Sequence, residues 1–241
     1  MTQPTDIAEL IRRNWMRVTD EVRQAAVAAG RDPKSVRVIG VSKYVDAATT
    51  RLLFDAGCCD LGESRPQVLW KKAETIGPAV DGTTNRSLRW HMIGHVQTNK
   101  LRRMLPLNPL IHSVDSERLL RAINREAERQ QRVTEVMLEV NISGDEDKTG
   151  LSPDAVGQLL GIPGLNSVRI SGLMAMAGWG TEASQAASQF RDVAELRDRL
   201  VASDEYNLPH LSMGMSGDFR EAIAAGATMV RIGSALFEGV R

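Results

Sequence analysis

Three segments of the chain carry side chains that could act on a small molecule. Lys43 follows the apolar run Val36–Val41 after a single serine, so an amine stands where a buried strand is expected to stop. The segments "SMGMSGDF" from Ser212 and "RIGSALF" from Arg231 are rich in small residues, and each leads into a helix-like stretch. Small residues let backbone N–H groups approach an anion, and a helix N-terminus adds partial positive charge. An amine beside an anion site suits a phosphorylated carbonyl compound.

Each of these features also has a plain structural explanation. Ser216 or Asp218 could cap the helix that follows, and Gly233 could serve only a turn. Their occurrence after two neighbouring strands favours a phosphate site. For Lys43, spacing alone does not decide between two readings. One is a surface lysine with a solvated amine, and the other is a partly desolvated lysine that attacks carbonyls.

The elements that would position these residues alternate along the chain. Residues 7–29 carry a helical pattern that Gly30 and Pro33 close. The predicted strands are Val36–Val41, Cys59–Leu61, Arg89–Ile93, Leu110–His112, Glu135–Asn141, Arg169–Met174, His210–Leu211 and Thr228–Arg231. The predicted helices between and after them are Ala47–Ala56, Pro66–Thr75, Thr98–Leu105, Glu117–Gln130, Pro153–Leu160, Ala183–Val201 and Gly217–Ala225.

This alternation predicts parallel βαβ units. Eight strands in 241 residues fit a single-domain (β/α)8 TIM-type barrel over residues 1–241, with an extra N-terminal helix. A doubly wound open sheet is the alternative, and the count of eight favours the barrel. Such barrels keep their chemistry at the C-terminal ends of the strands, often with a phosphate site after strands 7 and 8. Lys43 would then share one mouth with both small-residue segments. This suggests pyridoxal 5′-phosphate (PLP), held as an aldimine by Lys43 and by its phosphate at residues 212–216 and 233–234.

Composition and charge narrow the partners. The formal net charge is zero, which disfavours nucleic acid as the principal partner. The sequence has neither an apolar run of membrane-spanning length nor a signal-peptide pattern, so we expect a cytoplasmic protein without a membrane partner. Cys58 and Cys59 are adjacent, lack the spacing of zinc ligands, and are expected to be buried thiols, so no metal site is predicted. No apolar seam stands out, which favours a monomer.

Seven segments together resemble a known family. They are "VIGVSKYV", "LGES", "RWHMIGHVQTNKLR", "IHSVDSERL", "LEVNISGDEDKTGL", "ISGLMAMA" and "LSMGMSGDFREAIAAGATMVRIGSALFEG". In this order they resemble the pyridoxal phosphate homeostasis protein family, also called the alanine racemase N-terminal-domain-like family, from about residue 7 to the C-terminus. The resemblance implies a PLP-binding barrel with the aldimine on Lys43. It also implies that Arg231 faces the pyridine nitrogen.

The resemblance extends to further cofactor contacts. It implies Ser212 and Ser216 near the phosphate, with backbone N–H groups of Gly233 and Ser234 on it. The full expected set is Lys43, Ser64, Met174, Ser212, Met213, Gly214, Ser216, Arg231, Gly233 and Ser234. Met174 would pack against the cofactor ring at a strand end or simply fill the core. Ser64 stands where the family usually has asparagine, and its shorter side chain would reach the ring hydroxyl only through water.

The resemblance favours a carrier over an enzyme. The related racemases take a second base from a C-terminal β domain and a partner subunit, and this chain ends at Arg241, shortly after the last predicted strand. We therefore expect a protein of intracellular PLP homeostasis, without catalytic residues, that buffers PLP or delivers it to apo-PLP enzymes. The alternatives are a PLP-dependent amino-acid racemase, which would turn over an amino acid, and a Schiff-base aldolase acting on a phosphorylated sugar, which would bind no chromophore.

Overall fold

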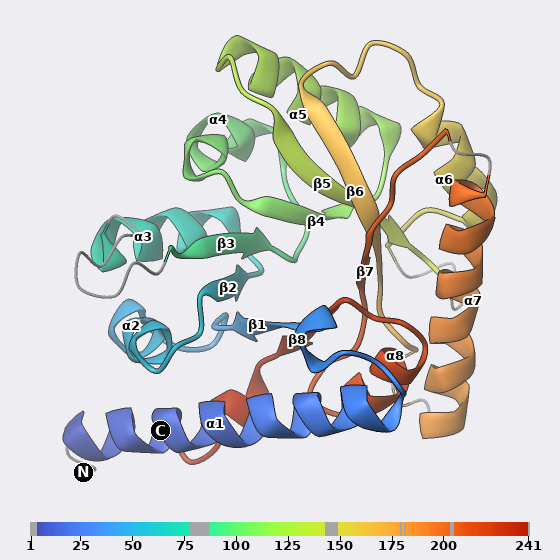
Figure 1. Cartoon of the computed structure of the whole chain (residues 1–241). Helices are drawn as coiled ribbons and strands as arrows, with labels where there is room; N and C mark the ends of the chain where they lie inside the picture. The colour runs from blue at the N-terminus through green and yellow to red at the C-terminus, as the bar shows by residue number, and fades with distance from the viewer. Residues whose placement is uncertain are drawn as a thin grey trace.

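Eight parallel strands form a closed barrel in the order β1 to β8 in the computed structural model, which describes residues 4–77, 87–142, 149–178, 180, 182–202 and 205–240. The strands lie at the centre and helices surround them (Figure 1). β1 pairs with β8 from Arg37↔Met229 to Gly40↔Ile232, which closes the sheet on itself. The predicted (β/α)8 barrel is confirmed, and the open sheet is excluded.

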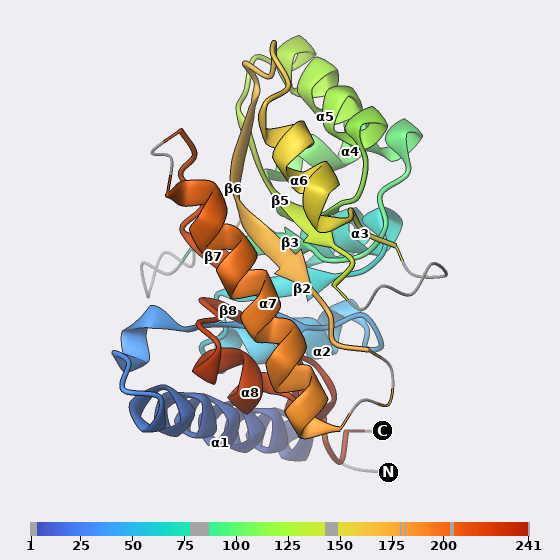
Figure 2. The ribbon, with the colours of Figure 1, turned by 90° about the vertical axis from the view of Figure 1, so that its right-hand side faces the viewer.

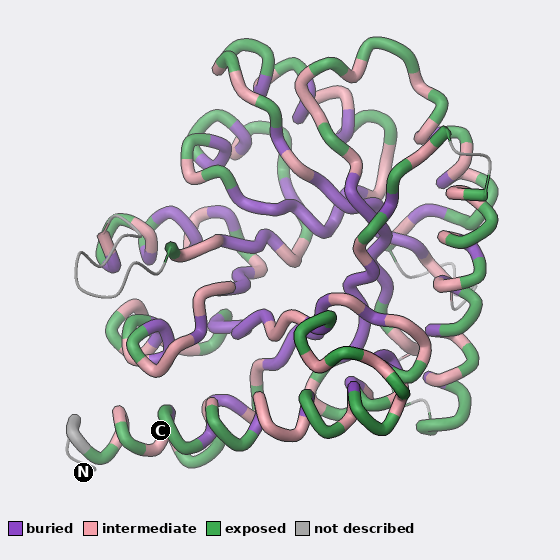
Figure 3. Tube along the Cα trace, in the orientation of Figure 1, coloured by how far each residue is buried: buried purple, intermediate pink, exposed green. Residues whose placement is uncertain are grey.

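The strands fall where the apolar runs predict them, with ends that differ by at most two residues. Their bounds are β1 Arg37–Val41, β2 Asp60–Glu63, β3 Arg89–Met92, β4 Leu110–Val114, β5 Thr134–Val140, β6 Val168–Ala175, β7 His210–Ser212 and β8 Met229–Ile232. Successive residues of a strand alternate between the barrel interior and the helical layer. Ile39, Leu110, Met137, Met174 and Met229 form an apolar cluster of their own, apart from the larger core. Figure 3 shows buried residues concentrated along the strands.

The helices are α1 Pro4–Ala28, α2 Ala47–Asp55, α3 Pro66–Ile76, α4 Leu101–Met104, α5 Glu117–Arg129, α6 Pro153–Leu160, α7 Ala183–Val201 and α8 Phe219–Ala224. α1 is the extra N-terminal helix. It packs against α2 and α8, across the place where the first and last units meet (Figures 1 and 2).

One predicted helix is wrong in detail. Residues Thr98–Leu105 were predicted as one helix, but the structure has a 3-10 turn Thr98–Lys100, the single α-helical turn α4, and a second 3-10 turn Leu105–Leu107. Pro106 supplies no N–H for a continued helix, and Asn108 adopts a left-handed φ of 48° that ends the segment. This short, turn-rich segment leaves the residues after β3 close to the barrel mouth.

Candidate cofactor-binding site

Lys43 lies in the turn that follows β1, at the C-terminal end of the barrel. Its side chain is exposed, and its Nζ lies 4.9 Å from the centroid of the Tyr44 ring. Of the two readings left open by the sequence, the structure therefore favours the lysine with a solvated amine. Burial ends at Ser42, and both residues of the turn that follows, 43 and 44, are exposed. An aldehyde entering from solvent can reach this amine directly.

A buried cluster fixes the backbone next to Lys43. Lys72 of α3 is 3% exposed and Glu63 of β2 is fully buried. Lys72 Nζ donates to Glu63 Oε1 at 2.5 Å, to the Ser42 carbonyl at 2.7 Å and to the Ser42 hydroxyl at 3.2 Å. The Ser42 hydroxyl in turn donates to Glu63 Oε1 at 2.8 Å. These acceptors use the three N–H donors of the ammonium group, so Lys72 acts as a clamp on the end of β1.

Two turns after β7 and β8 bring polar donors together, as predicted for Ser216 and Gly233. The Ser216 hydroxyl oxygen accepts from the backbone N–H of Gly233 at 3.4 Å and from that of Ala235 at 3.5 Å. Ser234 lies between Gly233 and Ala235 in the sequence. It is exposed and begins the 3-10 turn Ser234–Leu236. We call the Ser216 hydroxyl and these two N–H groups the Ser216 cradle. Converging N–H and O–H donors of this kind bind phosphate oxygens.

Glycines allow the close approaches around the cradle. Gly214 has φ +86°, and a Cβ there would lie 2.6 Å from the Ala222 Cβ. A Cβ on Gly233 would lie 3.3 Å from the Val41 carbonyl oxygen. Gly233 is thus packed on the end of β1, two residues before Lys43. The structure therefore brings the predicted lysine and the predicted phosphate turn to adjacent strand ends.

Arg231 of β8 is buried inside the barrel mouth. Its Nη1 donates to the carbonyl oxygen of Ser212 at 2.6 Å and to the Ser212 hydroxyl at 2.8 Å, and its Nη2 donates to the Ala175 carbonyl at 2.9 Å. Burial lowers the pKa of Arg231 to about 10, which leaves the guanidinium charged at neutral pH. The hydrogen bonds of the Ser212 hydroxyl go to Arg231 and to His112, and not to the Ser216 cradle.

The remaining predicted residues occupy different environments. Met174 is 1% exposed and belongs to the apolar cluster of the barrel interior. Met213 is fully buried in the larger core, so its side chain faces the helical layer. Ser64 is half-buried after β2, and its carbonyl oxygen would lie only 2.5 Å from a Cβ on Gly94. The turn after β3 therefore packs directly on the turn that carries Ser64.

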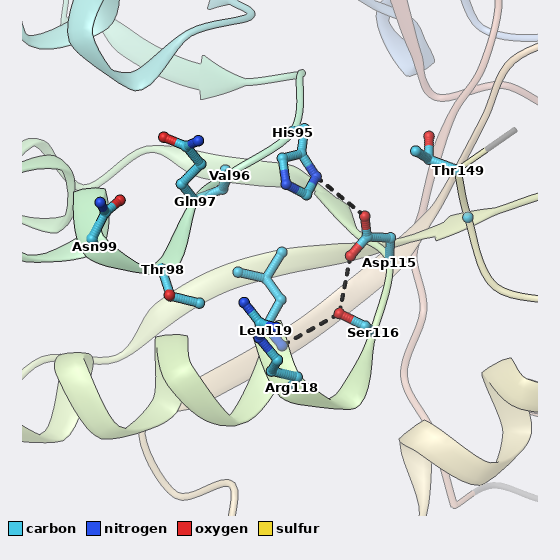
Figure 4. Close-up of a pocket in the computed structure, with 11 residues that line it drawn as sticks. His95, Val96, Gln97, Thr98, Asn99, Asp115, Ser116, Arg118, Leu119 and Thr149 are labelled. Carbon is cyan, nitrogen blue, oxygen red and sulfur yellow. Dashed lines mark hydrogen bonds and ion pairs between the residues drawn. The ribbon is translucent and has the colours of Figure 1, made fainter.

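Sequence reasoning missed a polar cavity at the same end of the barrel (Figure 4). Its volume is about 860 Å³, and it is lined by His95, Val96, Gln97, Thr98, Asn99, Asp115, Ser116, Arg118, Leu119, Thr149 and Gly150. His95 points toward Asp115, with 3.4 Å between Nδ1 and Oδ2, and the Ser116 hydroxyl donates to Asp115 at 3.1 Å. None of the predicted cofactor residues lines this cavity. The polar residues that follow β3 and β4 in the sequence were its signal.

Two carboxyl groups, one buried and one half-buried, stand near the barrel mouth. Burial raises the pKa of Glu139, which is 5% exposed and accepts from the Thr149 hydroxyl at 2.8 Å. Burial also raises the pKa of Asp218, whose carboxylate accepts from the Met215 N–H at 2.6 Å. The positive charge of Arg231 lowers the pKa of both groups and so opposes the effect of burial. The buried guanidinium of Arg231 thus acts on two carboxyl groups whose pKa values burial raises.

The cysteines differ from each other in burial. Cys58 is buried as predicted, whereas Cys59 is half-buried. Over the described ranges, no group of three or more His, Cys, Asp or Glu side chains is arranged to hold a metal ion. Among those same residues, none of the helices has both the length and the apolar character needed to cross a membrane.

The chain is similar to known proteins over nearly its whole length. Residues 9–240 match the family model described as alanine racemase, N-terminal domain. A protein of Aquifex aeolicus named pyridoxal phosphate homeostasis protein is 36% identical over 222 residues, which cover 92% of this chain and 94% of that protein. A protein of Pseudomonas aeruginosa with the same name is 37% identical over 229 residues, covering 94% of each.

The chain is also similar to a solved structure. PipY of Synechococcus elongatus, solved with PLP bound, is 32% identical, with a TM-score of 0.75 over 89% of this chain and 98% of PipY. The similarity thus covers sequence and fold together, and it includes the strand ends that carry Lys43, Ser216 and Gly233.

Proposed function

Because the chain belongs to the alanine racemase N-terminal-domain family, and within it to the pyridoxal phosphate homeostasis proteins, we propose that it binds PLP in the mouth of its barrel. The observation that carries the proposal is the position of Lys43. Its exposed amine follows β1, and the adjacent turn after β8 holds the N–H groups of the Ser216 cradle. An amine and an anion site therefore lie on neighbouring strand ends.

The residues present fit this cofactor. PLP supplies an aldehyde that bonds covalently to amines, an aromatic ring and a dianionic phosphate. The Lys43 nitrogen would bond to the aldehyde carbon, and the aldehyde oxygen would leave as water. The Ser216 cradle, with the backbone of Ser234, would hold the phosphate. Arg231 would lie at the pyridine nitrogen, and its permanent charge would keep that nitrogen unprotonated.

The other proposed residues would contact the cofactor through water, backbone or apolar groups, or only through Arg231. Ser64 follows β2 and would reach the ring hydroxyl through water. Met213 and Gly214 would contribute backbone only, since the Met213 side chain is buried in the larger core and Gly214 has none. Met174 belongs to the apolar cluster of the barrel interior and would lie beneath the ring. Ser212 would act through Arg231, because its hydroxyl is held there.

We propose that the physiological role is to hold and release PLP rather than to convert an amino acid. The relatives from Aquifex aeolicus and Pseudomonas aeruginosa are named for homeostasis and not for a reaction. The protein would work in the cytoplasm as a single-domain monomer over residues 1–241. Its partners would be PLP and apo-PLP enzymes that receive it.

Borohydride reduction tests this function. The purified protein is incubated with PLP, its visible absorbance is recorded, and the adduct is reduced and mapped by mass spectrometry. We expect a yellow protein with one label on Lys43, and no label in the Lys43→Arg variant. A label elsewhere, or none, would overturn PLP binding through Lys43. Turnover of an amino acid by the loaded protein would contradict the carrier role and indicate a racemase or lyase.

A further inference from the structure

A continuous chain of hydrogen bonds crosses the barrel interior. Asp60 Oδ1 lies 2.8 Å from His91 Nε2, and His91 Nδ1 lies 2.9 Å from His112 Nε2. His112 Nδ1 then lies 2.9 Å from the Ser212 hydroxyl, which lies 2.8 Å from Arg231 Nη1. We call these five residues the interior relay. It joins the start of β2, at the N-terminal end of the barrel, to Arg231 at the mouth.

The chemistry of Arg231 and Asp60, the two ends of the relay, decides which atom donates at each contact. A guanidinium can only donate and an ionised carboxylate can only accept. Ser212 accepts from Arg231, so its single hydroxyl proton is available for His112 Nδ1. His112 then carries its proton on Nε2 and donates to His91 Nδ1, and His91 donates from Nε2 to Asp60. With both rings neutral, this is the one assignment in which every contact has a donor and an acceptor.

The surroundings support neutral rings. His112 is fully buried, and its neighbours His91, Arg231, Arg89 and His210 all oppose its protonation. His91 is also fully buried. Burial lowers the pKa of His91, and Arg89 and Arg37 lower it further. The Asp60 carboxylate raises this pKa, but by less than burial lowers it. A protonated His91 would place another cation in an interior that already holds Arg231.

Burying the polar groups of the relay costs desolvation free energy. It runs past the apolar cluster of Ile39, Leu110, Met137, Met174 and Met229, where apolar side chains of similar volume would avoid the desolvation of two imidazoles. Fully satisfied polar networks fix a unique geometry in return. The group at the functional end of this network is Arg231, and two of its three hydrogen bonds described above go to Ser212.

We propose that Asp60, His91 and His112 are positioning residues that hold the Arg231 guanidinium through the Ser212 hydroxyl. The inference rests on the proposed function, in which Arg231 meets the pyridine nitrogen of PLP. It adds that the orientation of this cation is set from the opposite end of the barrel. There Asp60 is one-fifth exposed and lies 3.7 Å from the guanidinium of Arg37.

The first test uses the unaltered protein without cofactor. Nitrogen-15 NMR distinguishes the two neutral tautomers of histidine from imidazolium. At pH 7 we expect His91 and His112 both neutral with the proton on Nε2. An Nδ1–H tautomer or an imidazolium at either residue would overturn the relay as assigned. This measurement does not depend on PLP binding or on the folding of a variant.

The second test asks whether the relay acts on Arg231. His112→Leu removes both ring nitrogens, whereas His112→Gln keeps a donor and an acceptor in one amide. We expect the Leu variant to broaden the Arg231 guanidinium resonances and to weaken PLP binding about tenfold, the effect of one lost buried hydrogen bond. The Gln variant should recover most of both. Met137→Leu, a change in the apolar cluster, should alter neither.

The outcomes separate the two proposals. Wild-type Arg231 resonances in His112→Leu, or equal losses in the Leu and Gln variants, would overturn the positioning role. A wild-type protein that takes no label on Lys43 would overturn the proposed function instead. In that case the guanidinium resonances of the variants still decide whether the relay holds Arg231.

Discussion

The Nζ of Lys72 lies 2.7 Å from the carbonyl oxygen of Ser42, the residue that immediately precedes Lys43. The exposed lysine proposed to bind the cofactor thus follows a backbone group that a buried lysine holds. α3 carries the buried amine, β2 supplies the Glu63 counter-charge, and both fix the end of β1. The Lys43 side chain is exposed, whereas the backbone carbonyl just before it is held by a buried hydrogen bond.

The first prediction concerns this clamp. Lys72→Met leaves the buried Glu63 carboxylate without its charged partner, and breaking a buried ion pair from one side costs about 3–5 kcal/mol. We expect urea denaturation to show a loss of that size, together with slower labelling of Lys43. Arg23→Ala, which breaks an ion pair with Asp20 whose side chains are 65% and 46% exposed, should cost less than about 1 kcal/mol. Equal losses in the two variants would contradict the clamp.

The second prediction concerns the phosphate. Ser216→Ala removes a hydroxyl from the cradle, and a hydrogen bond to a charged group contributes about 1.5–3 kcal/mol. PLP should therefore bind about tenfold to a hundredfold more weakly, as measured by absorbance titration. Pyridoxal, which has no phosphate, is the matched control ligand, and its binding should not change. An equal loss for both ligands would place the phosphate elsewhere.

The third prediction concerns Gly214. Gly214→Ala forces a Cβ to within 2.6 Å of the Ala222 Cβ, at a φ of +86° that alanine adopts only with strain. We expect a loss of stability of roughly 1–3 kcal/mol in chemical denaturation. Gly217 lies three residues away, and a Cβ there would meet no atom within 4 Å. Gly217→Ala should leave stability nearly unchanged, and a similar loss in both would exclude the proposed clash.

The fourth prediction concerns pH. Burial raises the folded-state pKa of Glu139 above that of an exposed glutamate, so the folded protein binds more protons at this site than the unfolded chain. Wild-type stability from this group therefore falls as pH rises from about 4.5 through the folded pKa. Glu139→Gln removes this dependence and keeps an acceptor for Thr149. The stability of the variant relative to wild type should rise from pH 4.5 to pH 7.

A second glutamate provides a control of opposite sign. The hydrogen bond from Arg129 lowers the pKa of Glu126, so its contribution to stability is present at neutral pH and lost on acidification. Glu126→Gln should therefore lose stability relative to wild type as pH rises. The same slope in both variants would mean that net charge, and not the local environment, sets the dependence.

The order of elements could be predicted from the sequence because it depends on local periodicity. Even the three-residue strand β7 was identified from a short apolar run, and its one additional residue, Ser212, is polar. The predicted helix over residues 98–105 failed where Pro106 and Asn108 impose tight turns on a short segment. Local patterns therefore located the elements and were less reliable for their geometry.

The candidate site could be predicted only in part, because its contacts join distant segments. Lys43 was predicted from its place after an apolar strand, and Ser216 and Gly233 from small residues at strand ends. The clamp was missed because Lys72 is a lysine on a helix, a residue type and position that usually face solvent. The relay was missed because His91 and His112 become neighbours only when β3 and β4 pair. The exposure of Lys43 depends on where burial ends, which no single residue type reveals.

Closure of the barrel has a consequence for biosynthesis. Lys43 follows the first strand and Gly233 follows the last, and the two meet only because β1 pairs with β8. A nascent chain that has not yet emerged as far as β8 would display the amine without the groups that hold the phosphate. Contacts this distant along the chain form late, since they close the largest loop. Tight cofactor binding would therefore report that β8 has paired with β1 and closed the barrel.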